Sequence, residues 1–63
     1  MKLKNSQLIS TKRLLKEAHE LVADVQGIFH NCGDAETASR LREIGEAIIH
    51  EIEYVNRLEA GQP

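Results

Sequence analysis

Apolar residues recur along the first half of the chain with alternating spacings of four and three residues, at Leu14, Ala18, Leu21, Val25 and Ile28. This spacing is the heptad pattern of a helix that packs against another helix. A second row repeats every seven residues beside it, at Leu8, Leu15, Val22 and Phe29. The stripe is wider than a two-stranded coiled coil needs. It therefore predicts a helix over about residues 6–30 that touches two or more neighbours.

The pattern breaks at residues 31–34, which read Asn-Cys-Gly-Asp. Gly33 is suited to the left-handed conformation that ends many helices. Asp34 is a favourable N-cap for a following helix, and Glu36 suits its first turn. Because the connection is only a few residues long, the two helices must be antiparallel neighbours.

A second periodic segment predicts a helix over about residues 35–59. Its central row repeats every seven residues, at Leu41, Ile48 and Val55. One flank of that row holds Ala38, Gly45 and Ile52, and the other holds Ile44, Glu51 and Leu58. Both predicted helices are about 25 residues long, or roughly 37 Å, so that their faces match from end to end.

The chain has 63 residues and one cysteine, so it forms one domain and cannot contain an internal disulfide. A core this small needs help from outside the chain. We therefore expect an all-α fold, a two-helix antiparallel hairpin over residues 1–63 that self-associates into a dimeric four-helix bundle. The ends, 1–5 and 61–63, should fray. The predicted dimer core is Leu14, Ala18, Leu21, Val25, Ile28, Leu41, Ile44, Gly45, Ile48, Ile52 and Val55. The pattern leaves the relative direction of the two hairpins and a higher assembly open.

Charge is distributed unevenly although the net charge is only −2. The first sixteen residues carry five basic side chains and no acidic one, whereas residues 43–59 carry five glutamates and one arginine. If the chain folds about Gly33, residue i lies near residue 65 − i, and Lys12 approaches Glu53. Glu51 interrupts an apolar flank. It is expected to pair with a base such as Arg13, to exclude other registers, or to mark an opening where a partner docks.

Gly45 weakens its helix by about 1 kcal/mol relative to alanine. In the expected register it lies near His19 and Glu20. A close approach of the two helices there is one explanation, and a tolerated glycine is the other.

Candidate chemistry is sparse. His19, His30 and His50 lack the spacing of zinc or di-iron ligands, and they are interpreted as surface residues. Cys32 lies in the turn, where a catalytic thiol would have neither a partner base nor a pocket. We therefore expect no catalytic, cofactor or metal site, and a protein that is not an enzyme.

No segment resembles a secretory signal, and no run of about 18 apolar residues could span a bilayer. The single cysteine favours a reducing compartment. These features predict a cytoplasmic protein without membrane contact.

In length and topology the expected architecture resembles the small Rop-type plasmid RNA-binding regulators, which are hairpins that dimerise into four-helix bundles. No shared motif carries functional residues over to this chain. The leading hypothesis is a small non-enzymatic homodimer that binds and modulates another protein through its helical surface. The alternative is a Rop-like regulator that binds RNA or another nucleic acid through its basic N-terminal third. The candidate surface for either partner is Lys12, Arg13, Lys16 and Tyr54.

Overall fold

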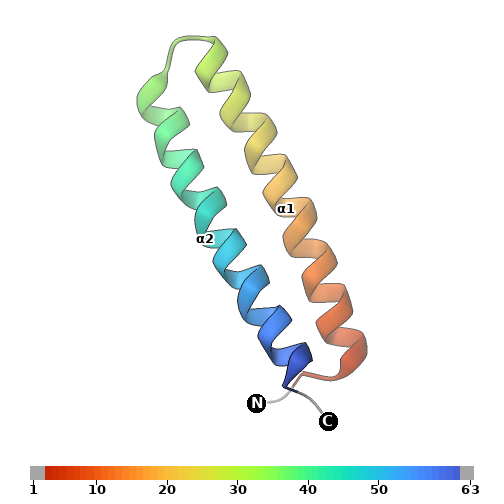
Figure 1. Cartoon of the computed structure of the whole chain (residues 1–63). Coiled ribbons are helices and arrows are strands. Elements are labelled where there is room, and N and C mark those ends of the chain that lie inside the picture. The colour runs from red at the N-terminus through yellow and green to blue at the C-terminus, as the bar shows by residue number, and fades with distance from the viewer. Residues whose placement is uncertain (1–2, 62–63) are drawn as a thin grey trace.

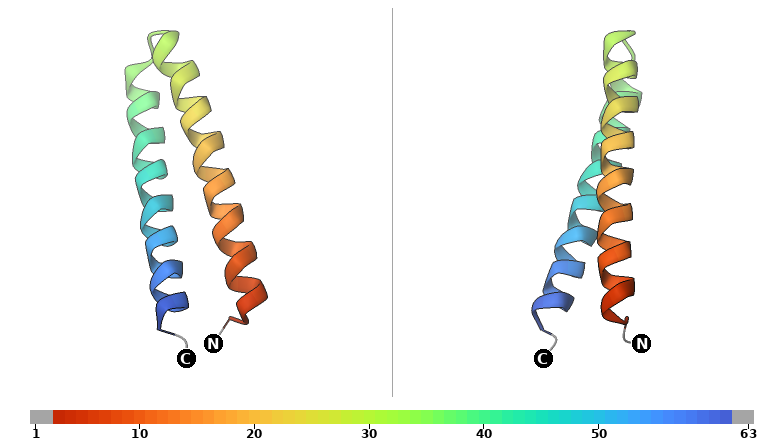
Figure 2. Two further views of the ribbon diagram at one scale, coloured as in Figure 1. Left: turned by 45° about the vertical axis from the view of Figure 1, so that its right-hand side comes forward. Right: turned by 90° about the vertical axis from the view of Figure 1, so that its right-hand side faces the viewer.

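The computed structural model describes residues 3–61 and shows a hairpin of two antiparallel α-helices (Figure 1). Helix α1 spans Asn5–Asn31 and helix α2 spans Ala35–Ala60. The molecule measures 48 × 16 × 15 Å, and the start of α1 and the end of α2 lie at the end opposite the turn. The helices cross at a shallow angle (Figure 2). The expected all-helical hairpin is confirmed.

The helices are slightly longer than the ranges read from the sequence. α1 begins and ends one residue outside 6–30, and α2 ends one residue beyond 59. Part of the predicted fraying falls on residues 1–2 and 62–63, which lie outside the described residues. Asn5 is the first helical residue, and Lys4 is the N-cap before it. The backbone N–H of Lys4 donates a hydrogen bond of 2.9 Å to Gln7 Oε1. This bond satisfies a backbone donor at the helix start.

The turn ends α1 in a Schellman motif. Gly33 has a φ of +90°, a conformation that residues with a Cβ rarely adopt. Its N–H donates to the carbonyl oxygen of His30 at 3.2 Å, and the N–H of Asp34 donates to that of Phe29 at 3.0 Å. These are the two bonds that define the motif. They reverse the chain within three residues and so force α2 back along α1.

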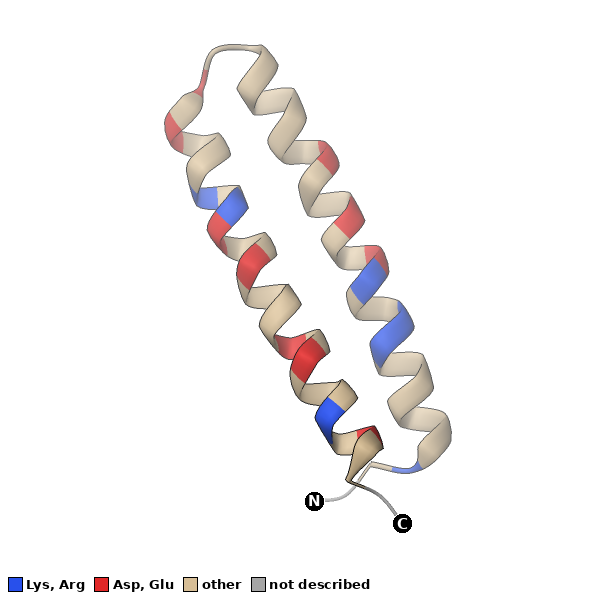
Figure 3. Ribbon diagram, viewed as in Figure 1, with Lys and Arg blue, Asp and Glu red and all other residues tan. Residues whose placement is uncertain are grey.

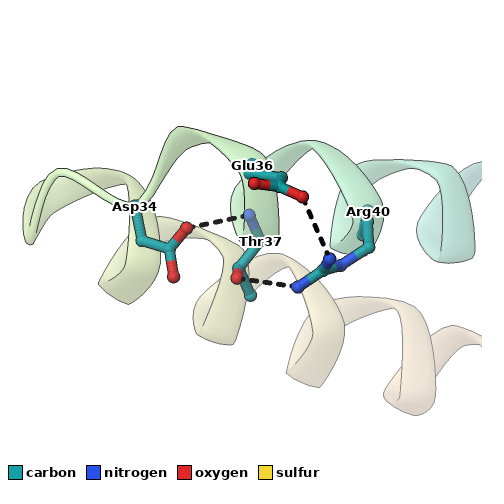
Figure 4. A network of polar contacts seen from close by, with 4 residues as sticks. All are labelled: Asp34, Glu36, Thr37 and Arg40. Carbon is teal, nitrogen blue, oxygen red and sulfur yellow. Dashed lines mark hydrogen bonds and ion pairs between the residues drawn. The ribbon is translucent and has the colours of Figure 1, made fainter.

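Asp34 begins α2 by capping its first turn (Figure 4). Its Oδ1 atom accepts a hydrogen bond of 3.0 Å from the backbone N–H of Thr37. The pKa of the Asp34 carboxyl is lower than its ordinary value of 3.8. The main cause is this hydrogen bond from the Thr37 backbone, and a hydrogen bond from the Thr37 side chain is a further cause. The ionised carboxylate therefore stabilises the folded hairpin.

The core of the single hairpin is thin. Within residues 3–61 the buried apolar side chains are Leu8, Ala38 and Val55, and Leu8 is 1% exposed. The remaining contact between the helices is made by half-buried side chains, which include Leu15, Val22, Phe29, Leu41, Ile48 and Ile52. One layer of side chains between two helices leaves much of the apolar stripe of each helix unused.

The charged contacts differ from the expected ones. Lys12 pairs with Glu59 and not with Glu53. The difference follows from side-chain direction, because a lysine on α1 leans toward the N-terminus of its own helix and so toward the open end of the hairpin. Glu59 Oε1 has no well-aligned hydrogen-bond partner among the described residues, so the Lys12 ammonium is its compensating charge. The expected pairing of Glu51 with Arg13 is absent, since both side chains are exposed and neither forms an ion pair within residues 3–61.

Gly45 is buried against α1. Its nearest neighbours there are His19, which the expected register placed beside it, and Val22, where the register had placed Glu20. A Cβ built on Gly45 would lie 3.8 Å from His19 Cδ2 and 3.8 Å from Val22 Cγ1. These are ordinary van der Waals distances. The helices therefore leave room for a methyl group, and close approach does not require glycine here.

Replacing Asp34 with alanine should lower the thermal midpoint by several degrees at neutral pH, because the Thr37 N–H loses its acceptor. The folded-state pKa is lowered, so this stabilisation is present above the unfolded-state pKa and is lost as the pH falls through the folded-state value. The difference between wild type and Asp34→Ala should thus shrink toward about pH 2 in circular-dichroism melts. Asp34→Asn, which still caps, is the matched control. A cost of Asp34→Ala that stays constant with pH would contradict the assignment.

Replacing Gly45 with alanine should raise the free energy of unfolding by about 0.5–1 kcal/mol in urea titrations, because alanine is the better helix former and its methyl group fits. Gly27→Ala on α1 is the matched control, since a Cβ there meets nothing within 4 Å. Gly45→Leu should destabilise the protein because the space against His19 and Val22 accepts only a methyl group. If Gly45→Ala lowers the free energy of unfolding while Gly27→Ala raises it, the contact between the helices requires the glycine at position 45.

Candidate interaction surface

The predicted dimer core divides into two sets in the hairpin. The α2 members Gly45 and Val55 are buried, and Leu41, Ile48 and Ile52 are half-buried, all within the single chain. On α1 the packed row is instead the flanking one, namely Leu8, Leu15, Val22 and Phe29. The remaining predicted core residues lie outside: Ala18 is half-buried, and Leu14, Leu21, Val25, Ile28 and Ile44 are exposed.

The geometry of α1 explains this division. Successive residues of an α-helix are rotated by about 100°. Leu14, Leu21 and Ile28 each precede a packed residue of the next row by one position, so they lie on one flank of the contact with α2. Leu21 and Ile28 are each 65% exposed, which is high for leucine and isoleucine. A whole heptad row of α1 is thus left uncovered by the hairpin.

On α2, apolar side chains lie on the same flank of the hairpin as the uncovered row of α1. The contact of Gly45 with His19 identifies the opposite flank, where an open hollow of about 290 Å³ also lies between the helices. Ile44 is rotated by about 100° from Gly45 and therefore lies on the flank that carries Leu21. We call this flank the open apolar face. Its exposed members are Leu14, Leu21, Val25 and Ile28 of α1 and Ile44 and Ala47 of α2, and the half-buried Ala18 and Leu58 lie at its edges.

Two opposite charges border the α2 part of the open apolar face. Arg40 lies one turn before Ile44, and Glu51 lies one turn after Ala47. Arg40 Nη1 is 3.5 Å from Glu36 Oε1, and its Nη2 donates to Thr37 Oγ1 at 3.1 Å (Figure 4). The Arg40–Glu36 pair is well exposed and so contributes little to stability. The sequence analysis did not single out Arg40, because its position gains meaning only once Ile44 is known to be exposed.

The basic residues of α1 lie toward the open end of the hairpin, while glutamates follow α2 (Figure 3). Arg13 and Lys16 are exposed and unpaired within residues 3–61, whereas Lys12 is engaged by Glu59. Lys16 follows Leu15 and so lies on the flank opposite the open apolar face. Tyr54, which is 50% exposed, lies at the edge of that face on α2. The hairpin therefore does not bring Tyr54 together with Arg13 and Lys16.

The hollow on the opposite flank contains several polar groups. It is lined by Gln26, His30, Ala35, Ala38, Ser39 and Arg42. His30 and Arg42 are exposed, and the hollow is open to solvent. Such a site does not exclude water from a reacting group.

Ligands for a metal ion are not gathered in the described part of the chain. Within residues 3–61 no three histidine, cysteine or acidic side chains lie close enough to hold one. His19 is half-buried over Gly45, so it differs from the solvated residue that the sequence indicated. Cys32 is exposed in the turn, and its thiol lies 3.3 Å from the carbonyl oxygen of Phe29.

Neither helix has a stretch within residues 3–61 that is long and apolar enough to cross a membrane. Comparison of the chain with known protein families, with curated proteins and with solved structures finds no match.

Proposed function

We propose that this chain is a small non-enzymatic interaction protein whose unit is a homodimer, a four-helix bundle that binds and modulates another protein through its helical surface. The observation that carries the proposal is the open apolar face. Monomeric proteins rarely expose contiguous apolar surface of this kind, and such surface marks sites of protein–protein contact. A cytoplasmic location is part of the proposal.

The thin core supports self-association independently. A 63-residue chain with three buried apolar side chains in its described part has little to offset the entropy of ordering two long helices. Pairing two open apolar faces would add a second layer of side chains. Folding and association would then be coupled, and stability would rise with protein concentration.

Binding of a further protein would use the surface left outside the pair. That surface is long, and it is formed by the polar flanks of both helices. It includes the exposed side chains Ile9 and Ile49, which lie on the flank of the hollow, away from the open apolar face. Isolated apolar groups amid polar ones are typical of a surface that binds a partner protein reversibly.

Leu21→Asp should raise the dissociation constant of the homodimer at least about a hundredfold, because two buried, unpaired carboxylates would enter the interface. Helicity should fall with it at micromolar concentration. Sedimentation velocity and far-ultraviolet circular dichroism across a dilution series measure both effects.

Ile9→Asp is the matched control, since Ile9 is 62% exposed, against 65% for Leu21, and lies on the other flank. It should leave the dimer intact. It should weaken capture of a partner protein from an extract of the native host, in which wild type is the reference bait. The proposal would be wrong if the wild-type chain sediments as a compact monomer throughout the dilution series and also melts cooperatively.

A second candidate function is nucleic-acid binding, and it is favoured by one observation. Arg13 and Lys16 lie on adjacent turns of α1. Both side chains are exposed, and neither forms an ion pair within residues 3–61. In a homodimer these charges occur twice. Contacts of this kind bind phosphates with an affinity that falls steeply with salt.

The double variant Arg13→Glu/Lys16→Glu should abolish the low-salt gel shift of a mixed RNA and DNA probe set if this function is real, because the phosphate contacts become repulsive. Arg42→Glu, a charge reversal at the hollow near the other end, is the control and should retain the shift. Absence of any shift by the wild-type protein at low salt would exclude this candidate.

A further inference from the structure

We infer that the flank opposite the open apolar face is a shallow groove that binds an acidic amphipathic helix of a partner protein. The hollow of about 290 Å³ near the turn is one end of this groove. The partner helix places apolar side chains over the middle of the groove and carboxylates along its edges. The inference rests on the proposed binding of a partner protein, and it names the chemistry of that partner.

The floor of the groove is a strip of small or half-buried side chains from both helices. On α2 it contains Ala38 and Gly45, which are buried. On α1 it contains His19 and Gln26, which are half-buried. His19 lies against Gly45, and Gln26 and Ala38 line the hollow, so the strip is continuous. Because neither alanine nor glycine projects far, the floor leaves room for side chains of another helix.

Exposed side chains form a rim on each side of this floor. The α1 rim repeats every seven residues and alternates apolar with basic side chains, through Ile9, Lys16, Ala23 and His30. The α2 rim repeats with the same period, through Arg42, Ile49 and Asn56. Neither rim contains an acidic residue, although aspartates and glutamates outnumber lysines and arginines in the chain.

The basic side chains of the rims have no partner within the hairpin. Those of Lys16, His30 and Arg42 are exposed, and none forms a hydrogen bond or an ion pair within residues 3–61. His30 and Arg42 line the hollow from opposite helices, together with the side chains of Gln26 and Ser39. All four side chains can donate hydrogen bonds, and none of the lining residues carries a carboxylate. The hollow therefore favours a carboxylate as its occupant.

Basic and apolar side chains alternate across the groove as well as along it. In the register given by Gly45, Ile49 is level with Lys16 on the opposite rim. Arg42 is likewise level with Ala23. Lys16 and Arg42 lie roughly 11 Å apart along the groove, or about two helical turns. A helix between the rims therefore meets a base on one edge and then, two turns on, a base on the other.

A partner helix with a heptad pattern fits this arrangement. Its apolar a and d residues lie over the floor and against Ala23 and Ile49, while acidic e and g residues reach the bases on both rims. Arg42 can hold a carboxylate through two parallel hydrogen bonds, which a single ammonium group cannot do. The charges set the choice of partner and the rate of association more than the affinity.

Glutamates outside the rims disfavour a nucleic acid in the groove. Glu20, Glu46 and Glu53 are exposed, and each follows a rim residue by four positions. Each is thereby rotated about 40° further from the contact between the helices. A phosphate backbone, which is charged along its whole length, would meet these carboxylates, whereas a helix can carry acids only at the edges that face the rims. Tyr54, which could stack on a base, lies at the edge of the other flank.

A synthetic helix tests the groove with defined chemistry. The probe is a fluorescein-labelled peptide of three heptads, with leucine at a and d and glutamate at e and g. A second probe has lysine in place of every glutamate. In fluorescence anisotropy, the wild-type protein should bind the glutamate probe at least about tenfold more tightly than the lysine probe, because the rim bases attract one and repel the other.

The double variant Lys16→Glu/Arg42→Glu should reverse this preference, because both rim contacts change sign. Misfolding would weaken both probes and could not produce the reversal. Arg40→Glu is the matched control, since Arg40 is also an exposed arginine of α2 but borders the open apolar face. It should keep the wild-type preference. A double variant that still prefers the glutamate probe would overturn the inference.

The same measurements separate this inference from the proposed function. A wild-type protein that binds neither probe, or both equally, would overturn the groove, while partner binding would still stand if Ile9→Asp weakens capture of a host protein. Loss of a nucleic-acid gel shift in Arg42→Glu would also overturn it, because the groove would then hold phosphates. A wild-type monomer that prefers the glutamate probe would support the groove and remove the homodimer from the proposed function.

Discussion

Two helices cannot cover the apolar surface that this chain carries. Each helix has a stripe wide enough for two neighbours, and the hairpin supplies only one. The result is a single packed layer, with Leu8 and Val55 near the open end and Ala38 near the turn as its buried apolar side chains. The exposed side chains of the open apolar face, Leu14, Leu21, Val25, Ile28 and Ile44, lie outside that layer. The proposed homodimer follows from this excess of apolar surface over the means to bury it.

The turn decides which apolar residues are left over. The Schellman bonds at Gly33 and the cap at Asp34 fix the direction and rotation of α2 relative to α1. With that rotation, the row through Leu15 and Val22 packs inward and the row through Leu21 turns outward. A different turn would reverse the choice and would change the surface presented to a partner. The few polar contacts of the turn thus help to determine which residues more than ten positions away are exposed.

Charges in this protein act on orientation more than on stability. The ion pair of Lys12 with Glu59 joins the two helices near the open end of the hairpin. The ion pair of Arg40 with Glu36 is well exposed. Neither contributes much free energy in water. Arg40 and Glu51 nevertheless border an apolar surface, where an unmatched charge is costly and a matched one is tolerated. Such charges restrict how another chain can pack on this surface, because each must meet an opposite charge or stay in contact with water.

The sequence by itself determined the helices, the turn and the antiparallel direction, because these depend on local propensity, on capping and on the heptad period. It also showed that the stripes are too wide for one neighbour. It could not tell which row meets which neighbour, since rows one position apart on a helix are equally apolar and differ only by a rotation of about 100°. That choice belongs to the tertiary structure, where the geometry of the turn sets the rotation. Thus Ile48 and Ile52 lie inside the hairpin and Leu21 and Ile44 outside, although all four belong to one predicted core. The partner predicted for Lys12 was wrong, and the exposure of Glu51 was left undecided, for the same reason. Both depend on side-chain direction across a contact between two helices, which no periodicity along one helix contains.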